Sequence, residues 1–154
     1  MVIRWLLAAI HLLAYGFALA SILRRSVALR HCSTPAGLPP VFHADGGWGI
    51  SALVLIVTGL MRAFGGYEKG TDYYLHEPLF HWKMAALVLI LLLEITPMIA
   101  LIRWRIVLKK GGTPDLSRAK RYAGIGVVQA VLLILMVFAA TGMARGIGLP
   151  ANAV

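Results

Sequence analysis

Acidic side chains are scarce in this sequence, and so are charged side chains in general. Six of the 154 residues are Asp or Glu, charged residues make up 14% of the chain, and hydrophobic residues make up 60%. A soluble domain averages about 25% charged and about 45–50% apolar residues. The chain has too few polar side chains to cover a water-soluble surface. We therefore expect an integral membrane protein with a single domain, residues 1–154.

Cysteine is almost absent as well. The single thiol, Cys32, excludes an intrachain disulfide and every metal motif that needs paired cysteines. The net charge of +9 would suggest nucleic-acid binding in a soluble protein. Here most basic residues flank apolar segments, where membrane topology and anionic lipids account for them. We expect contact with the lipid bilayer and no binding of nucleic acid.

Four stretches are apolar over roughly the 20 residues that a bilayer-spanning helix needs. They are residues 3–23, 47–64, 79–102 and 122–143. Pro and Gly punctuate the connections STPAGLPP (33–40) and KGGTP (110–114), which are predicted loops. The polar and aromatic segment 65–78 is predicted to form a short amphipathic turn on the membrane surface. The predicted fold is all-α, a four-helix transmembrane bundle.

Lys and Arg are shared unevenly between the two predicted faces of this bundle. One face carries Arg24, Arg25, Arg30, Arg103, Arg105, Lys109, Lys110, Arg118, Lys120 and Arg121. The other face carries Arg4, Arg62, Lys69 and Arg145. The positive-inside rule assigns the richer face to the cytoplasm, which leaves both termini outside.

The first apolar run allows a second interpretation. Arg4 precedes it, and Ala18 and Ala20 form an A-x-A-like site, as in a cleaved signal peptide. A retained helix is favoured because the run contains His11 and continues to Arg24, as a spanning segment would.

Two spans end in similar sequences. The second ends in TGLMRAFG from Thr58 and the fourth in TGMARGIG from Thr141, with Thr, Gly, Arg and Gly at identical spacing. The same offset lays the first helix over the third. Two duplicated helical hairpins would be related by an axis along the membrane normal. Coincidence within apolar sequence is the alternative.

Ionisable residues inside a span cost about 2.5–3.5 kcal/mol each on insertion scales, so they usually face the interior of a bundle. His11, Lys83 and Glu94 lie within the predicted spans, and His81 and Arg62 lie at their outer rim. Several basic groups around one outer cavity would repel one another without an anion. We therefore expect a carboxylate, phosphate, propionate or quinone oxygen among them.

Glu94 is predicted to lie deeper than Lys83 on the same face of the third span, about 16 Å further along the helix. Gln129 and the Arg24–Arg25 pair are plausible partners at that depth. One interpretation is an interhelical hydrogen bond that fixes packing. The other makes Glu94 a proton-relay carboxylate and, with Lys83, a catalytic residue.

His11 has two interpretations, an interhelical hydrogen bond or a metal ligand. Imidazole is the common haem ligand in membrane bundles, and Ala14, Gly16 and Ala18 leave room nearby. A second axial ligand must lie at a similar depth, and Met136 does so. His81 is the other candidate. Met136 is otherwise a core residue.

The segments AAIHLLAYG, around His11, and HWKMAALVLILLL, around Lys83, resemble small bacterial inner-membrane proteins of unknown function. More distantly, they resemble HemJ-type protoporphyrinogen oxidases and the membrane domain of CopD copper-resistance proteins. This resemblance implies a multi-pass protein of the bacterial inner membrane. The HemJ-type resemblance implies bound haem b, with His11 and Lys83 as functional residues and Arg62 as their basic partner. TGLMRAFG and Glu94 depart from that pattern.

We therefore expect a haem b-binding redox protein that transfers electrons or oxidises a quinone- or porphyrin-like substrate near the outer leaflet. His11 would ligate the iron, and Lys83 and Arg62 would hold an anionic group. A proton-coupled small-molecule or metal-ion transport unit, acting as a homo-oligomer, is the first alternative. An accessory subunit of a larger membrane complex is the second.

Overall fold

The computed structural model describes residues 2–67 and 71–147, and its regular elements are helices. In chain order they are α1 (Val2–His31), the 3-10 helix η1 (Pro35–Gly37), α2 (Leu38–Phe64), α3 (Thr71–His76), α4 (Pro78–Lys109) and α5 (Ala119–Ala144). Helices α1, α2, α4 and α5 are long and apolar enough to cross a membrane. The predicted all-α, four-helix transmembrane fold is confirmed. Lys69, which counts towards the predicted topology, lies outside the described residues. So does Gly148, the last residue of the repeated motif TGMARGIG.

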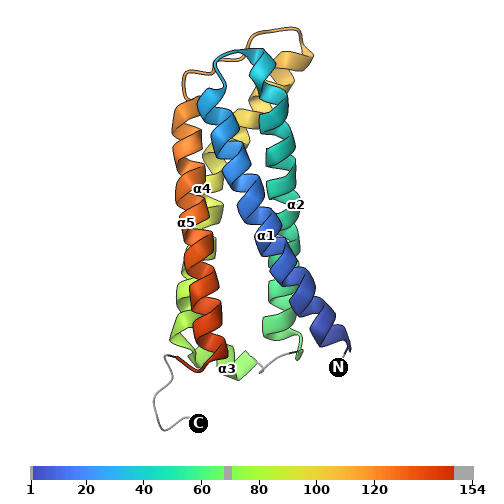
Figure 1. The fold of residues 1–154 in the computed structure, drawn as a ribbon, viewed down its shortest axis with the longest axis vertical. Coiled ribbons are helices and arrows are strands. Elements are labelled where there is room, and N and C mark those ends of the chain that lie inside the picture. The colour runs from blue at the N-terminus through green and yellow to red at the C-terminus, as the bar shows by residue number, and fades with distance from the viewer. Residues whose placement is uncertain (1, 68–70, 148–154) are drawn as a thin grey trace.

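The four long helices run along the axis of the bundle (Figure 1). The pairs of helices differ in how extensively they pack on each other. Helix α2 packs on α1, α1 on α5 and α5 on α4, whereas α2 and α4 form no extended contact. Helix α1 begins and α5 ends beside α3, which defines the α3 end of the bundle. The opposite end, where α1 and α4 finish, carries most of the Lys and Arg residues and is called the basic end below.

The helices extend beyond the predicted spans at the basic end, so those boundaries were wrong. Helix α1 continues through Arg24 and Arg25 to His31, and α4 continues to Lys109. The predicted loop 33–40 shrinks because α2 already begins at Leu38, with proline in its first turn. Arg has good helix propensity, and proline fits the first turn of a helix. The predicted spans follow hydropathy, which falls before the helices end. The predicted spans are therefore shorter than the helices.

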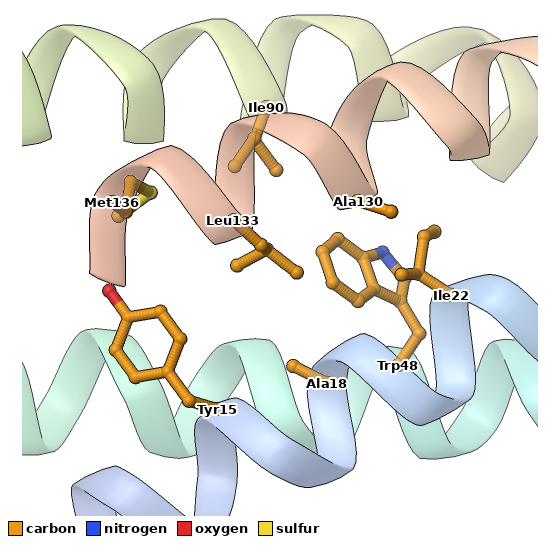
Figure 2. Packing of buried hydrophobic residues seen from close by; sticks show 8 residues of the cluster. All are labelled: Tyr15, Ala18, Ile22, Trp48, Ile90, Ala130, Leu133 and Met136. Carbon is orange, nitrogen blue, oxygen red and sulfur yellow. The ribbon is translucent and has the colours of Figure 1, made fainter. Parts of the chain in front are cut away.

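The apolar core is built from all four long helices. Its central cluster consists of Tyr15, Ala18, Ile22, Trp48, Ile90, Ala130, Leu133 and Met136. Figure 2 shows small residues of α1 and α5, Ala18 and Ala130, interspersed with Trp48 and Leu133. Small side chains let helices approach closely within a membrane, where the hydrophobic effect does not drive them together. This packing holds α1 against α5 and fixes one side of the cavity described below.

Gly126 of α5 lies so close to α1 that an added Cβ would overlap the Ser26 hydroxyl. Ser26 donates a hydrogen bond to the Ile22 carbonyl and cannot turn away without losing it. We expect Gly126→Ala to lower the free energy of unfolding by about 1–3 kcal/mol. Gly124→Ala is the control, since nothing lies within 4 Å of its Cβ position. Thermal unfolding in detergent measures both, and equal losses would contradict close α1–α5 packing.

Candidate functional site

A cavity of about 570 Å³ lies inside the bundle and is lined mainly by α2 and α4. On α2 its lining runs from Asp45 to Phe64, and on α4 from Phe80 to Met98. Eighteen or more residues of helix correspond to about 27 Å along the bundle axis. The cavity is therefore an elongated groove, and its walls are largely apolar. We call it the α2/α4 cavity.

The α2/α4 cavity opens sideways, between the two helices that form no extended contact with each other. Several lining residues are also exposed on the outer surface of the bundle. They include Leu60, Phe64, Leu91 and Met98, which are 52%, 47%, 43% and 44% exposed. In a membrane that surface faces lipid, so the cavity is connected to the hydrocarbon of the bilayer.

His11 lines this cavity and is held by a chain of hydrogen bonds from α2. Its Nδ1 lies 2.7 Å from Thr58 Oγ1, and Thr58 Oγ1 donates to the Val54 carbonyl at 2.6 Å. With the Thr58 hydroxyl donating to the Val54 carbonyl, the tautomer that completes this pattern has His11 Nδ1–H as the donor to Thr58. The neutral ring then carries its lone pair on Nε2, which has no hydrogen bond from the residues that the structure describes.

Two other basic side chains line the same part of the cavity as His11. Lys83 Nζ lies 5.9 Å from the centre of the Tyr15 ring, and Tyr15 in turn stacks edge-on against His11. Arg62 lines the cavity one helical turn beyond Thr58. Met136 is also a lining residue, from α5, and it belongs to the same core cluster as Tyr15 (Figure 2). The structure thus brings His11, Lys83, Arg62 and Met136 to one cavity.

At the basic end the cavity is closed by a buried ionic network. Arg25 is fully buried and forms a two-pronged contact with Glu94, at 2.5 and 2.7 Å. It also donates to Asp45 Oδ1 at 2.9 Å and to Gln129. Gln129 Nε2 donates to Glu94 and to the Ile90 carbonyl. The predicted partners of Glu94 are present, and this geometry favours its packing role.

Arg105 of α4 extends the network towards the end of the bundle. Its guanidinium donates to Asp45 Oδ2 at 3.0 Å and to the Phe42 carbonyl, and it lies over the Phe42 ring. Asp45 thereby joins Arg25 and Arg105, and these contacts tie α2 to α4. Two arginines and two carboxylates make the network electrically neutral. Because these contacts join α2 to α4 at the basic end, the opening between the two helices lies along the rest of their length, towards the α3 end.

His81 is not brought to this cavity. It lies with His76 and Trp82 along a separate, shallow pocket, and its Nδ1 contacts the Glu77 carbonyl oxygen. Within residues 2–67 and 71–147, no three His, Cys, Asp or Glu side chains gather into a metal site. Of the two predicted candidates for a second axial ligand, only Met136 shares the cavity with His11.

Sequence reasoning missed three residues that shape the site. Asp45 precedes the predicted second span, and Arg105 follows the third, so the sequence predicts neither at membrane depth. Thr58 stands in the sequence prediction as the start of a repeated motif and not as a partner of His11. A helical wheel that started at Leu38 would place Asp45 and Trp48 on one face, which is the signal that was available.

Comparison with known proteins gives a family without a described activity. The chain matches the family model described as "Predicted membrane protein (DUF2214)" over residues 3–148. The comparisons found no matching curated protein and no matching solved structure. The match covers all four long helices and the residues of the α2/α4 cavity. The chain belongs to the DUF2214 family of predicted membrane proteins.

Proposed function

We propose that this protein is a redox protein of the bacterial inner membrane that binds haem b in the α2/α4 cavity. The observation that carries the proposal is the orientation of His11. Thr58 Oγ1 accepts a hydrogen bond from Nδ1–H, and the Nε2 lone pair has no partner from the described residues. Histidines that bind metals usually donate their other ring N–H to a fixed acceptor in this way.

The remaining lining supports the same ligand. Met136 offers a thioether from α5, and Met with His is a known axial pair for haem iron. Lys83 and Arg62 suit the two propionates of haem. The expected resemblance of the His11 and Lys83 segments to HemJ-type oxidases implies the same cofactor.

Bound haem b would supply one-electron redox chemistry at its iron. The contributions of the chain are separate from that chemistry. His11 is the ligand, Thr58 fixes the tautomer and orientation of its ring, and Lys83 and Arg62 neutralise anionic groups. The apolar walls exclude water from the cavity and admit a hydrophobic substrate, such as a quinone or a porphyrin.

The same arrangement supports a topology across the membrane. Because most Lys and Arg residues gather at the basic end, the positive-inside rule assigns that end to the cytoplasm. The α3 end and both termini then belong to the outer side. His11, Lys83 and Arg62 would serve the outer leaflet.

A second candidate function is a proton-coupled transport unit that acts as an oligomer. It is favoured by one observation, that the carboxylates of Glu94 and Asp45 line a cavity at membrane depth. In liposomes, Glu94→Gln would then abolish proton-coupled flux. The two-pronged contact with Arg25 argues against this candidate, because both carboxylate oxygens of Glu94 are engaged in a structural ion pair.

Titration of the purified protein with haemin tests the haem proposal. We expect saturable binding with one haemin per chain, followed at the Soret band. His11→Ala should weaken binding by more than the roughly 10–100-fold that loss of an outer-shell partner produces. His43→Ala is the control, since His43 is exposed near the basic end and bonds to the Pro39 carbonyl. Unchanged binding in His11→Ala would refute His11 as the ligand.

A further inference from the structure

The half of the α2/α4 cavity near the basic end is not explained by haem ligation at His11. The cavity continues from the level of Thr58 to Asp45, which is thirteen residues or about 20 Å along α2. Trp48 and Glu94 line this part, together with Leu91 and Met98. We call it the inner subsite.

The inner subsite combines an apolar wall with hydrogen-bond acceptors at one end. A carboxylate has about four lone-pair positions. Among the described residues, Asp45 receives two hydrogen bonds and Glu94 three. Their side chains keep 20% and 15% exposure. Acceptor positions are therefore left on two carboxylates that line the cavity.

The charges of this end select the kind of group that binds there. Arg25 and Arg105 neutralise the two carboxylates, so neither a free cation nor an anion is strongly attracted. Hydroxyl groups donate hydrogen bonds to such carboxylates without adding charge. The subsite thus suits a neutral, hydroxyl-bearing molecule with an apolar ring. Trp48 lies at the wall of this part of the cavity with 4% of its surface exposed, because the rest of its ring packs in the central core cluster.

The route into the subsite determines the rest of that molecule. The opening between α2 and α4 leads to the hydrocarbon of the bilayer, past exposed side chains such as Leu91 and Met98. A ligand that enters there must be dissolved in lipid. A long apolar chain could remain in the groove between α2 and α4 after the ring has bound.

We propose that the inner subsite binds the ring of a lipid-soluble quinol, whose hydroxyl groups donate to Glu94 and Asp45 and which enters sideways between α2 and α4. This inference rests on the proposed redox function, which requires a hydrophobic electron carrier as substrate. The quinone form has no hydroxyl donors on its ring and binds these carboxylates less tightly.

Two glycines of α2 provide a matched pair of variants. Nothing lies within 4 Å of the Cβ position of Gly46 or Gly49, so both tolerate a larger side chain. Gly49 lines the cavity and Gly46 does not. Gly49→Phe should fill the inner subsite, and it lies about 14 Å along α2 from Thr58, too far to displace a ligand at His11. Gly46→Phe should change neither site.

The experiment is a titration of the full chain in phosphatidylcholine nanodiscs with decylubiquinone, followed by Trp fluorescence. The other three tryptophans, the exposed Trp5 and Trp82 and the buried Trp104, are replaced by Phe so that the signal comes from Trp48. We expect saturable quenching in this background, in His11→Ala and in Gly46→Phe, and its loss in Gly49→Phe. Decylubiquinol should compete at about one tenth of the quinone concentration, since a hydrogen bond to a charged group contributes about 1.5–3 kcal/mol.

Three results would overturn the proposed quinol site. They are quenching that does not saturate, equal quenching in the two glycine variants, and displacement by 1-decanol at the concentration that suffices for decylubiquinol. The haem proposal fails separately. Saturable quenching in a chain that binds no haemin would contradict the proposed haem function but support the quinol subsite. Haemin binding without saturable quenching would support the haem function but contradict the quinol subsite.

Discussion

Replacing Arg25 by methionine is expected to lower the free energy of unfolding by about 3–5 kcal/mol. The fully buried guanidinium holds Glu94, Asp45 and Gln129 together. Methionine would fill part of the volume but leave the Glu94 carboxylate in the interior with Gln129 as its remaining partner. An uncompensated buried charge is the reason for the large effect.

Cys32 offers a direct measurement of this loss. It is the single thiol, it is 7% exposed, and burial raises its pKa. Reaction with a fluorogenic maleimide during heating therefore reports unfolding. Arg24→Met is the control, because Arg24 is exposed beside Arg25 on the same helix. Similar melting of the two variants would contradict a structural role for the network.

A double variant separates the charge from the packing. In Arg25→Met combined with Glu94→Gln, the buried carboxylate is replaced by a neutral amide. We expect the double variant to regain part of the stability that Arg25→Met loses, since removal of both partners is tolerated better than removal of one. A further loss in the double variant would mean that the amide and carboxylate contacts, rather than the charge, hold the helices.

Replacing Thr58 by valine is expected to weaken haemin binding by about 10–100-fold. Valine keeps the shape of threonine but removes the oxygen that accepts the hydrogen bond from His11 Nδ1–H. The ring of His11 would then lose its fixed orientation and tautomer. Haemin titration at the Soret band measures the change.

The internal repeat supplies the control for this variant. Thr141 also lines the cavity and occupies the position in α5 that Thr58 occupies in α2. Among the described residues its hydroxyl donates to the Phe138 carbonyl and not to His11. Thr141→Val should leave haemin binding unchanged. Equal losses in the two variants would show that the effect comes from general destabilisation and not from His11.

The membrane spans were predictable from the sequence because hydropathy over about 20 residues is a strong signal. The ends of the helices were not. Hydropathy falls at Arg24 and Asp45, yet both residues continue a helix in the structure. Helix formation depends on backbone hydrogen bonds and packing as well as on apolarity, so charged residues at the basic end extend α1, α2 and α4 beyond the apolar core.

The candidate site was predictable only in part. Depth along each helix follows from residue counts, and it correctly paired Glu94 with Gln129 and with the Arg24–Arg25 pair. The rotation of each helix about its axis does not follow from such counts. That rotation determines that Arg25, not Arg24, turns inward, and that His81 lies outside the cavity while Lys83 lines it.

The opening between α2 and α4 had no sequence signal at all. A symmetric pair of hairpins would pack α2 on α4 as α1 packs on α5. In the structure the α1–α5 contact is close, with Gly126 against Ser26. The equivalent pair, α2 and α4, is separated by the cavity.

The most direct test of the account is the absorption spectrum of the wild-type protein isolated from membranes in mild detergent, with haem supplied during expression. We predict a Soret band and, after reduction with dithionite, the narrow bands of a b-type haem at about one haem per chain. His11→Ala, folded as judged by Cys32 labelling, should lack them. A folded, colourless wild-type protein would contradict the central claim that His11 ligates haem b.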